Sequence, residues 1–410
     1  MQTLRTSCCI AGGGPAGMML GYLLARAGIQ VLVLEKHPDF LRDFRGDTVH
    51  PSTLDVIAEL GLLDDFLRLP HQEVRLLRGQ IGNTQVTMGD FAHVPTRCRF
   101  VALMPQWHFL NFLAERGSRL PSFKLLMQTQ VTGLREADGH VSGVEARGVD
   151  GPLEVQADLV IGADGRHSTV RARAGLTVED LGSPIDVLWL RLSRRPEDTT
   201  ETLGYFNYGH VFVTLDRGDY WQCAFVIRKG ELQELQLRGI EHIRKQIARL
   251  VPKFQDRVAE LRSWDDIKLL TVRVDRLRQW WKPGLLCIGD AAHAMSPIGG
   301  VGINLAIQDA VAAANILAAP LRNKKVSTED LAAVQRRRTF PTHFTQRFQT
   351  LIHDRVINRV LTSDHSVEPP WPVKLFDRVP ALRRIPAHVV GVGVRPEHVR
   401  IGVSSVASGP

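Results

Sequence analysis

Cysteine is scarce in this sequence, and the few cysteines form no recognisable pattern. Of 410 residues, five are cysteines, none has a C-x-x-C spacing, and all five lie in apolar surroundings. Disulfide frameworks and thiolate metal sites need cysteines that recur at fixed spacings. We therefore predict reduced thiols in the protein core, no disulfide and no bound metal.

Long uncharged apolar runs are also missing. No segment approaches the roughly 18 consecutive apolar residues that a membrane-spanning helix needs. The N-terminus has no charged stretch followed by an apolar core and a small-residue cleavage site. The sequence thus predicts no transmembrane segment and a cytoplasmic location.

Positive charge is abundant but not concentrated. The formal net charge is +8, a balance that also occurs in nucleic-acid-binding proteins. The lysines and arginines are scattered, however, and the densest group, residues 336–338, falls in a predicted helix. We interpret it as a solvated face with a mild attraction for anionic dinucleotides, and we predict no nucleic-acid partner.

A glycine-rich turn stands out near the start of the chain. Residues 6–11 read as a buried strand, and residues 15–27 have apolar side chains at helical spacing. Between them, Gly12, Gly14 and Gly17 fit the pattern G-x-G-x-x-G. Such glycines permit a tight turn, the approach of a pyrophosphate and close packing of helix on strand. The free N–H groups at the helix start favour an anion there.

An acidic residue follows at the spacing of a dinucleotide site. Residues 30–34 read as a second strand, and Glu35 ends it, 23 residues after Gly12. An acid at this place in a βαβ unit hydrogen-bonds the adenosine ribose. Glycine-rich turns also occur for purely steric reasons. Here strand, turn, helix, strand and acid agree in order, and they predict an α/β domain that binds a dinucleotide.

Two later segments complete a set of three motifs. Residues 157–171 (ADLVIGADGRHSTVR) form a strand that ends in Asp164, and residues 284–304 (GLLCIGDAAHAMSPIGGVGIN) form another, followed by Asp290. In this order the three motifs resemble the group A flavoprotein monooxygenases, the family of para-hydroxybenzoate hydroxylase and related aromatic hydroxylases. The resemblance covers roughly residues 5–320 and is weakest between about 185 and 275.

The resemblance implies a fold and an activity. The fold would be a Rossmann-like FAD-binding domain with an inserted antiparallel-sheet substrate domain and C-terminal helices. The activity would be hydroxylation of an aromatic or polycyclic small molecule through a flavin C4a-hydroperoxide. FAD would be bound noncovalently and O2 consumed. NAD(P)H would visit as a transient co-substrate, in keeping with the lack of a second G-x-G-x-x-G in the sequence.

The resemblance also assigns roles to single residues. Arg45 would lie beside the flavin and Gln106 would touch the ribityl chain. Asp164 would serve both FAD and the nicotinamide cofactor, and Asp290 would bind a ribityl hydroxyl. The residues expected at the cofactor are Gly12, Gly14, Pro15, Ala16, Gly17, Glu35, Lys36, Arg45, Gln106, Val131, Asp164, Gly289, Asp290, Pro297, Gly300, Gly302, Ile303 and Asn304.

A physical argument supports the flavin assignment at the third motif. Gly299, Gly300 and Gly302 open a helix, whose free N–H groups suit the N1–C2=O edge that becomes negative when a flavin is reduced. Pro297 would form a wall of the ring site. We interpret His293 as structural, because this hydroxylation needs no base there. The expected catalytic residues are Arg45, Pro297, Gly299 and Gly300.

The middle of the chain predicts a sheet. Residues 74–104 and about 183–228 alternate polar and apolar side chains among strong strand formers. In one strand Trp221 and Phe225 share a face, and the sequence leaves open which face covers the flavin. Side chains suited to an aromatic substrate pocket are Trp189, Arg191, Tyr205, Tyr208, His210, Trp221 and Phe225.

The predicted domain organisation is discontinuous. With 410 residues, 44% of them hydrophobic, the chain is long enough for two cores. The FAD-binding domain is predicted over 1–73, 105–182 and 276–320, the substrate sheet over 74–104 and 183–275, and a C-terminal helical segment over 321–410. Within that segment, residues 329–361 are predicted to form helices that are broken at Pro341 and pack on the FAD-binding domain.

Related flavoenzymes share these motifs, so alternatives stay open. A halogenase needs a lysine and a W-x-W-x-x-P segment, which Trp280-Trp281 does not match, and a prenyl-chain reductase is a further alternative. Disulfide reductases are disfavoured because a C-x-x-x-x-C redox pair is missing. A non-catalytic flavin-binding redox sensor and a homodimeric state also remain open.

Overall fold

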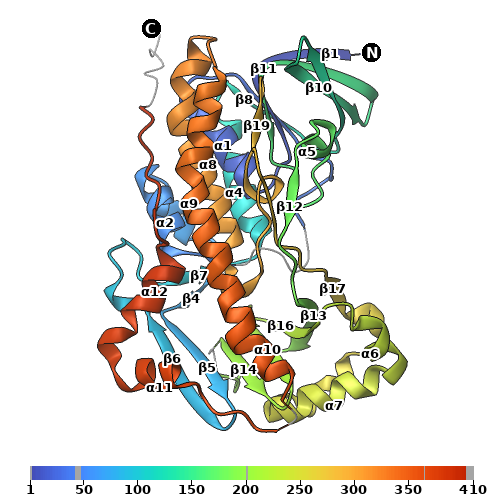
Figure 1. Ribbon diagram of the computed structural model, residues 1–410, viewed down its shortest axis with the longest axis vertical. Coiled ribbons are helices and arrows are strands. Elements are labelled where there is room, and N and C mark those ends of the chain that lie inside the picture. Colours follow the sequence, from blue (N-terminus) through green and yellow to red (C-terminus); the bar gives the residue numbers. More distant parts are fainter. Residues whose placement is uncertain (1, 42–47, 200–201, 364, 403–410) are drawn as a thin grey trace.

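The computed structural model describes residues 2–41, 48–199, 202–363 and 365–402 (Figure 1). The molecule is elongated, with one large sheet at each end. The helix α9 (Thr328–Ile352) runs along the molecule from the level of the first sheet to the level of the second (Figure 1).

The first sheet is built around β1 (Gln2–Ala11), whose last four residues are buried in the sheet centre. Its five parallel strands lie in the order β20 (Leu285–Cys287), β11 (Gly151–Gly162), β1, β2 (Val31–Leu34) and β8 (Phe123–Leu126). Antiparallel strands extend it, namely β19 (Trp281–Lys282) at the edge and the hairpin of β9 (Gln130–Ala137) and β10 (His140–Gly148).

Helices cover this sheet, as its apolar strands require. The helix α1 (Pro15–Arg26) packs on both α4 (Gln106–Ser118) and α8 (Gly302–Arg322). Ile298–Arg322 has the length and composition of a membrane span, but 72% of its most apolar window is buried inside the protein, as expected of a central core helix. The Rossmann-like α/β architecture predicted from the glycine turn is confirmed.

The second sheet has seven strands, and α6 (Leu232–Arg238) and α7 (Ile240–Leu250) lie beside it. The strand order is β17 (Lys268–Leu270), β13 (Ile185–Ser193), β16 (Tyr220–Arg228), β15 (His210–Asp216), β14 (Leu203–Asn207), β5 (Leu76–Ile81) and β6 (Thr84–Asp90). Neighbouring strands are antiparallel except for β14 and β5, which are parallel.

The prediction that all of residues 74–104 join this sheet is wrong. The strands β4 (Gln72–Val74) and β7 (Val101–Leu103) pair instead with β3 (Thr48–Val49) in a separate three-stranded sheet. Phe91, at a short turn after β6, is fully buried in a small cluster with Val101 and Leu103. This burial turns the chain away from the seven-stranded sheet before β7 begins.

The predicted helix break at Pro341 is also wrong, because α9 continues through this residue. Proline removes one backbone donor from a helix interior, but α9 is held by its packing along α8, which confirms the expected contact with the first domain. After α9 come α10 (Asn358–Leu361), α11 (Trp371–Arg378) and α12 (Arg384–Gly391).

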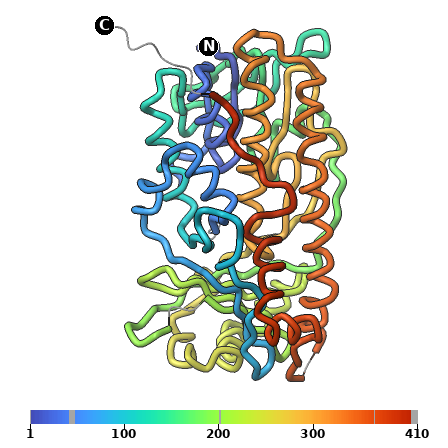
Figure 2. The backbone as a smooth tube through the Cα atoms, turned by 90° about the vertical axis from the view of Figure 1, so that its left-hand side faces the viewer, coloured from blue at the N-terminus to red at the C-terminus, as the bar shows by residue number. Residues whose placement is uncertain are grey.

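The end of the chain connects the two parts of the molecule. The helices α11 and α12 pack against β6 of the seven-stranded sheet, and the following segment then returns to the level of the first sheet (Figure 2). The smaller elements are α2 (Pro51–Glu59), α3 (Leu63–Leu67), α5 (Thr169–Arg173) and the strand pair β12 (Val178–Asp180) and β18 (Asp275–Leu277).

Candidate active site

The three glycines of the first turn meet different constraints. Gly12 has φ +106°, and a Cβ added there would overlap the carbonyl of Ala163. A Cβ on Gly17 would overlap the carbonyl of Gly12. Gly14 has an ordinary φ of −75°, and no atom of the described residues lies within 4 Å of its ideal Cβ position. Gly12 and Gly17 are therefore needed for packing, whereas Gly14 borders open space.

Glu35 is fixed beside this turn. Its Oε2 accepts a hydrogen bond from Gly13 N at 2.9 Å, and its Oε1 accepts one from His37 N at 3.0 Å. The side chain of the first residue after β2 is thereby held against the start of α1, where no side chain caps the helix. Open space at Gly14, uncapped N–H groups and a fixed acid fit the ADP half of FAD.

Asp164 and Asp290 follow two neighbouring strands of the same sheet. Asp164 comes after β11 and accepts hydrogen bonds from Ser168 Oγ at 2.5 Å and Val170 N at 3.1 Å. Burial raises its pKa, although these hydrogen bonds oppose the shift. Asp290 comes after β20, 3.5 Å from Arg166 Nη2. Because parallel strands end at one edge, both acids lie at the edge that carries the glycine turn.

The start of α8 is a second glycine-rich turn. Gly299 and Gly300 have φ of +77° and +63°, a region that side-chain-bearing residues rarely adopt. A Cβ on Gly300 would overlap the side chain of Thr48, whose Oγ1 donates a hydrogen bond to Gly300 O at 2.8 Å. Among the residues that the structure describes, no side chain caps α8. Its first N–H groups are available to an anionic or electron-rich ligand.

Asn304 holds the neighbouring segment in place. Its Oδ1 accepts hydrogen bonds from His50 N at 2.9 Å and Thr53 Oγ1 at 2.8 Å, and its Nδ2 donates to Thr48 O and Gly300 O at 3.1 Å. The side-chain amide is fully used inside the protein. Only the backbone N–H of Asn304 is left for the cofactor role that the sequence predicted.

Two residues that the sequence analysis missed, one in α9 and one directly after it, support the same loop. Gln349 Nε2 donates to Ser296 O and Ile298 O, each at 2.9 Å, and Gln349 Oε1 accepts from Ser296 N at 3.2 Å. His353 Nε2 lies 2.8 Å from Ser296 Oγ. No local signal marks these residues, because they follow the loop by more than 50 positions.

His293 belongs to a buried charge network. Its Nε2 is 2.6 Å from Asp309 Oδ2, and Arg338 Nε is 2.9 Å from Asp309 Oδ1. All three side chains are at most 1% exposed. Burial alone would raise the pKa of Asp309, but His293 and Arg338 reverse the shift and lower it. The network packs α9 on α8, which agrees with a structural interpretation of His293.

One face of the seven-stranded sheet is a core layer. Tyr205, Trp221 and Phe225 pack in one cluster with Ile243 and Ile247 of α7. His210 and Tyr208 also face this helix, through a 2.7 Å contact with the Gln246 side chain and a 4.0 Å stacking contact with Arg249. The prediction that these five aromatic residues line a substrate pocket is corrected, because α7 covers them.

The opposite face borders the glycine loop. There Trp189 and Val213 lie in a cluster that also contains Ile298 of the loop and Ile352 of α9. Arg191, two residues after Trp189 on the same face, stacks over the ring of Tyr220 at 4.9 Å. Of the seven predicted pocket residues, only Trp189 and Arg191 lie on this face.

The other predicted residues are distributed around the same edge. Gln106 begins α4 and is half-buried, Val131 lies buried on β9, and Lys36 is exposed next to Glu35. Pro297 is half-buried and precedes the turn of Gly299 and Gly300. Pro15, Ala16, Gly289, Gly302 and Ile303 lie in or beside the two glycine turns. Arg45 lies outside the described residues.

The described residues contain neither a disulfide nor a cluster of metal-binding side chains. All five cysteines are free and buried, and burial raises the pKa of the Cys9 thiol to about 12. Within the described ranges, no three His, Cys, Asp or Glu residues are grouped as a metal site would need.

A parallel sheet with two uncapped glycine-rich helix starts at one edge, joined to a second sheet, defines a dinucleotide-binding α/β protein. The chain matches the model of the FAD binding domain family over residues 5–348, and it belongs to this family. Relatives that match most of this chain are named as monooxygenases, and the protein is an FAD-dependent monooxygenase of the aromatic hydroxylase group.

Similar proteins cover nearly the whole chain. It is 35% identical over 385 residues to the 6-methylpretetramide 4-monooxygenase of Streptomyces rimosus, covering 93% of this chain and 91% of that protein. It is 26% identical to the para-nitrophenol 4-monooxygenase of a Pseudomonas species, with coverage of 83% and 84%. The p-nitrophenol 4-monooxygenase PnpA of Pseudomonas putida has the same fold, with a TM-score of 0.76, 22% identity and coverage of 94% and 97%.

Proposed function

We propose that this protein hydroxylates a ring of a polycyclic aromatic substrate, using FAD, NAD(P)H and O2. The observation that carries the proposal is the similarity to 6-methylpretetramide 4-monooxygenase along nearly the full length of both chains. A polycyclic substrate is larger than a single phenol. The seven-stranded sheet, which stands away from the first sheet, supports the proposal because it supplies an extended wall for such a molecule.

The residues at the carboxyl edge of the first sheet would hold FAD. The pyrophosphate would lie against Gly14 and the start of α1, and Glu35 would accept a hydrogen bond from the adenosine ribose. The flavin ring would lie near Pro297, with its electron-rich edge at the first N–H groups of α8, which stabilise negative charge. Asp164 and Asp290 would bind the part of FAD that lies between the pyrophosphate and the flavin ring. When bound, FAD supplies the redox and oxygen-transfer chemistry.

The protein would contribute position and exclusion of water. Trp189 lies on the sheet face that borders Ile298 of the glycine loop. This apolar face would keep the substrate ring over the loop and exclude bulk water from the reaction. Arg191 on the same face would contact an anionic oxygen of the substrate.

Further predictions from the sequence belong to this proposal. They are the role of Arg45 beside the flavin, the transient binding of NAD(P)H and a cytoplasmic location. A homodimer stays one alternative for the oligomeric state. The division into an FAD-binding domain, a substrate sheet and a C-terminal helical segment is proposed with the corrected placement of β4 and β7.

The test is product formation by FAD-loaded protein. NADH and NADPH oxidation would be followed with naphthacene-type polyketides, with p-nitrophenol and without substrate, under ¹⁸O2. We expect one labelled oxygen atom in the polycyclic product and little oxidation without substrate. Gly14→Val serves as a control that cannot hold FAD. Reductant consumption without any oxygenated product, or halide incorporation instead, would overturn the proposal.

A further inference from the structure

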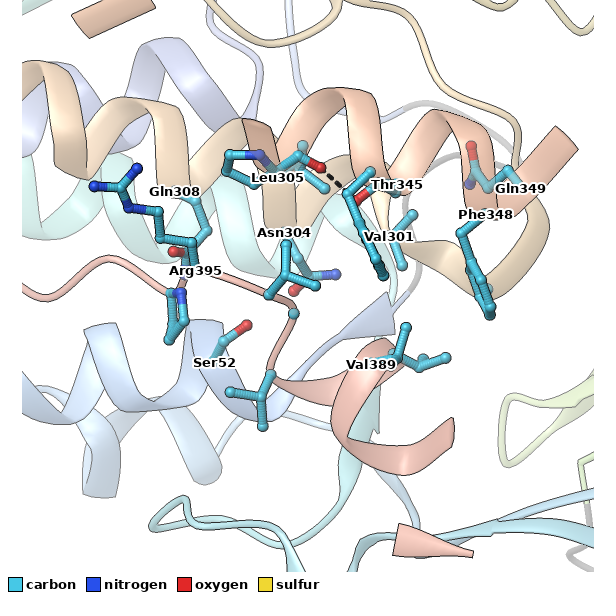
Figure 3. A pocket seen from close by; sticks show the side chains of 18 of the residues that line it. Ser52, Val301, Asn304, Leu305, Gln308, Thr345, Phe348, Gln349, Val389 and Arg395 are labelled. Carbon is cyan, nitrogen blue, oxygen red and sulfur yellow. Dashed lines mark hydrogen bonds between the residues drawn. The ribbon is translucent and has the colours of Figure 1, made fainter. Parts of the chain in front are cut away.

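A cavity of about 80 Å³ lies between α8, α9 and the segment after α12 (Figure 3). Gly299, Val301 and Asn304 border it, so it adjoins the glycine loop. Its lining contains none of Gly12, Gly14 or Glu35 and is therefore separate from the proposed ADP site. One water needs roughly 10–15 Å³ of such space, so the cavity has room for about one substituted ring.

The two ends of the cavity differ in chemistry. Gln308 and Arg395 lie at one end, whereas Phe348 lies at the other, beside Gln349, whose amide is already bonded to Ser296 and Ile298 (Figure 3). The wall is otherwise mainly apolar, and it includes Leu305, Phe344, Ile352, Val389 and Val392. Such a cavity suits a ligand with an apolar body and one polar end.

The polar end has an unused buried donor. Gln308 is 5% exposed, and its Oε1 accepts a hydrogen bond from Glu397 N. Its Nε2 has no hydrogen-bond partner in the part of the chain that the structure describes. A buried donor without a partner is destabilising, so a ligand with an acceptor at this position would be bound favourably.

Arg395 adds positive charge at the same end. Its side chain is exposed, and its guanidinium forms no ion pair with any described residue, while its backbone carbonyl accepts from Arg338. Gln308 Nε2 and the guanidinium are both donors. The ligand end that meets them must supply acceptor oxygens, and a negative charge on these oxygens is favoured.

We propose that this cavity binds a small aromatic carboxylate with a single ring. The ring lies between Leu305, Phe344 and Phe348, and a carboxylate oxygen accepts the hydrogen bond of Gln308 Nε2 close to Arg395. The bound ring also contacts Val301 and thereby restricts the glycine loop. An influence of the restricted glycine loop on the flavin would rest on the proposed function. The binding of the ligand does not rest on it.

The test is a titration of FAD-loaded protein with benzoate, followed by calorimetry. Gln308→Glu keeps the acceptor for Glu397 N but replaces the donor with a carboxylate, and we expect at least a tenfold loss of affinity. Val389→Phe fills the cavity and should also abolish binding. Arg395→Gln should weaken binding about threefold, since an exposed charge is screened. The matched control is Arg400→Gln, an exposed arginine on the same segment, which should bind like the wild type.

Three outcomes would overturn the proposal. The first is no saturable binding of benzoate in the millimolar range, which would leave a trapped water as the occupant of the cavity. The second is equal affinity for neutral benzamide. The third is benzoate binding that Gln308→Glu and Val389→Phe leave unchanged, which would place the ligand elsewhere, for example at the flavin. Thermal melting of each variant shows that it is folded, and a failure to detect hydroxylation would not affect these measurements.

Discussion

The two sheets of this protein differ in how much of their arrangement the sequence predicts. The parallel sheet carries its candidate site at the strand ends, where Gly12, Gly14 and Glu35 follow one another at a recognisable spacing in the sequence. In the seven-stranded sheet, the strand β16 is buried on both faces, with every residue from Trp221 to Ile227 buried. Without a polar face, alternation predicts a strand but not its orientation.

Buried charges, unlike the site signals, are of the same kind in both regions. In the first region Asp309 joins α8 to α9 through Arg338 and His293. In the second, Arg257 and the indole of Trp221 hold Asp198, and the Arg257 hydrogen bond lowers the pKa of that carboxyl. Removing one partner from either network would destabilise the protein, because it leaves an uncompensated buried charge. Charge burial alone therefore does not identify a functional region.

The largest expected effect separates ligand space from packing space within the first region. Gly14→Val should fold normally, because its backbone angles are ordinary and its Cβ position is open, yet it should lose all retained FAD. Gly17→Val should fail to fold, since its Cβ would overlap Gly12 O. Flavin absorbance of the purified proteins and circular dichroism would measure both effects. Stoichiometric FAD in Gly14→Val would contradict the pyrophosphate assignment.

The next prediction compares the two faces of the second sheet. Trp221→Ala should lower the free energy of unfolding by about 3–5 kcal/mol, because it leaves a cavity under α7, and should leave substrate affinity unchanged. Trp189→Ala should destabilise less and weaken substrate binding. Denaturant unfolding and substrate titration monitored by flavin absorbance give the two quantities. Weaker substrate binding in Trp221→Ala, with Trp189→Ala unaffected, would reverse the assignment of the faces.

A smaller effect is expected for the acid after β2. Glu35→Gln should raise the FAD dissociation constant by a factor that corresponds to about 1.5–3 kcal/mol, the value of a hydrogen bond to a charged group. Titration of the flavin-free protein with FAD would measure it. Glu115→Gln, on the exposed surface of α4, controls for the loss of one negative charge. An unchanged dissociation constant for Glu35→Gln would argue against the ribose role.

The smallest prediction concerns pH and the junction between the regions. His50 is buried, and burial lowers its pKa from 6.5 to about 4, although its hydrogen bond to Val390 O opposes the shift. The unfolded chain binds a proton that the folded protein does not, so stability falls as pH drops below about 6.5. At pH 5 this loss is about 2 kcal/mol.

Denaturant unfolding at pH 7 and pH 5 tests this expectation. His50→Gln should lose about 2 kcal/mol less than the wild type between the two pH values. Equal losses in both proteins would show that His50 binds protons alike in the folded and the unfolded states, and would contradict the lowered pKa.

The sequence by itself determined the parallel sheet and its glycine turn. Strand, turn, helix and acid are contiguous in residues 6–35, and each depends on the backbone angles and spacing of neighbours. The glycines at the start of α8 were recognisable for the same reason. These features are local, so reading the chain in order was enough to place them.

Only the tertiary structure decided how distant segments support and cover that site. Gln349 of α9 and His353 directly after it hold the glycine loop, and α7 covers Trp221 and Phe225. Packing on α8 keeps α9 continuous through Pro341. Each of these outcomes depends on which apolar face meets which, and that choice is made by the burial of surfaces far apart in the chain.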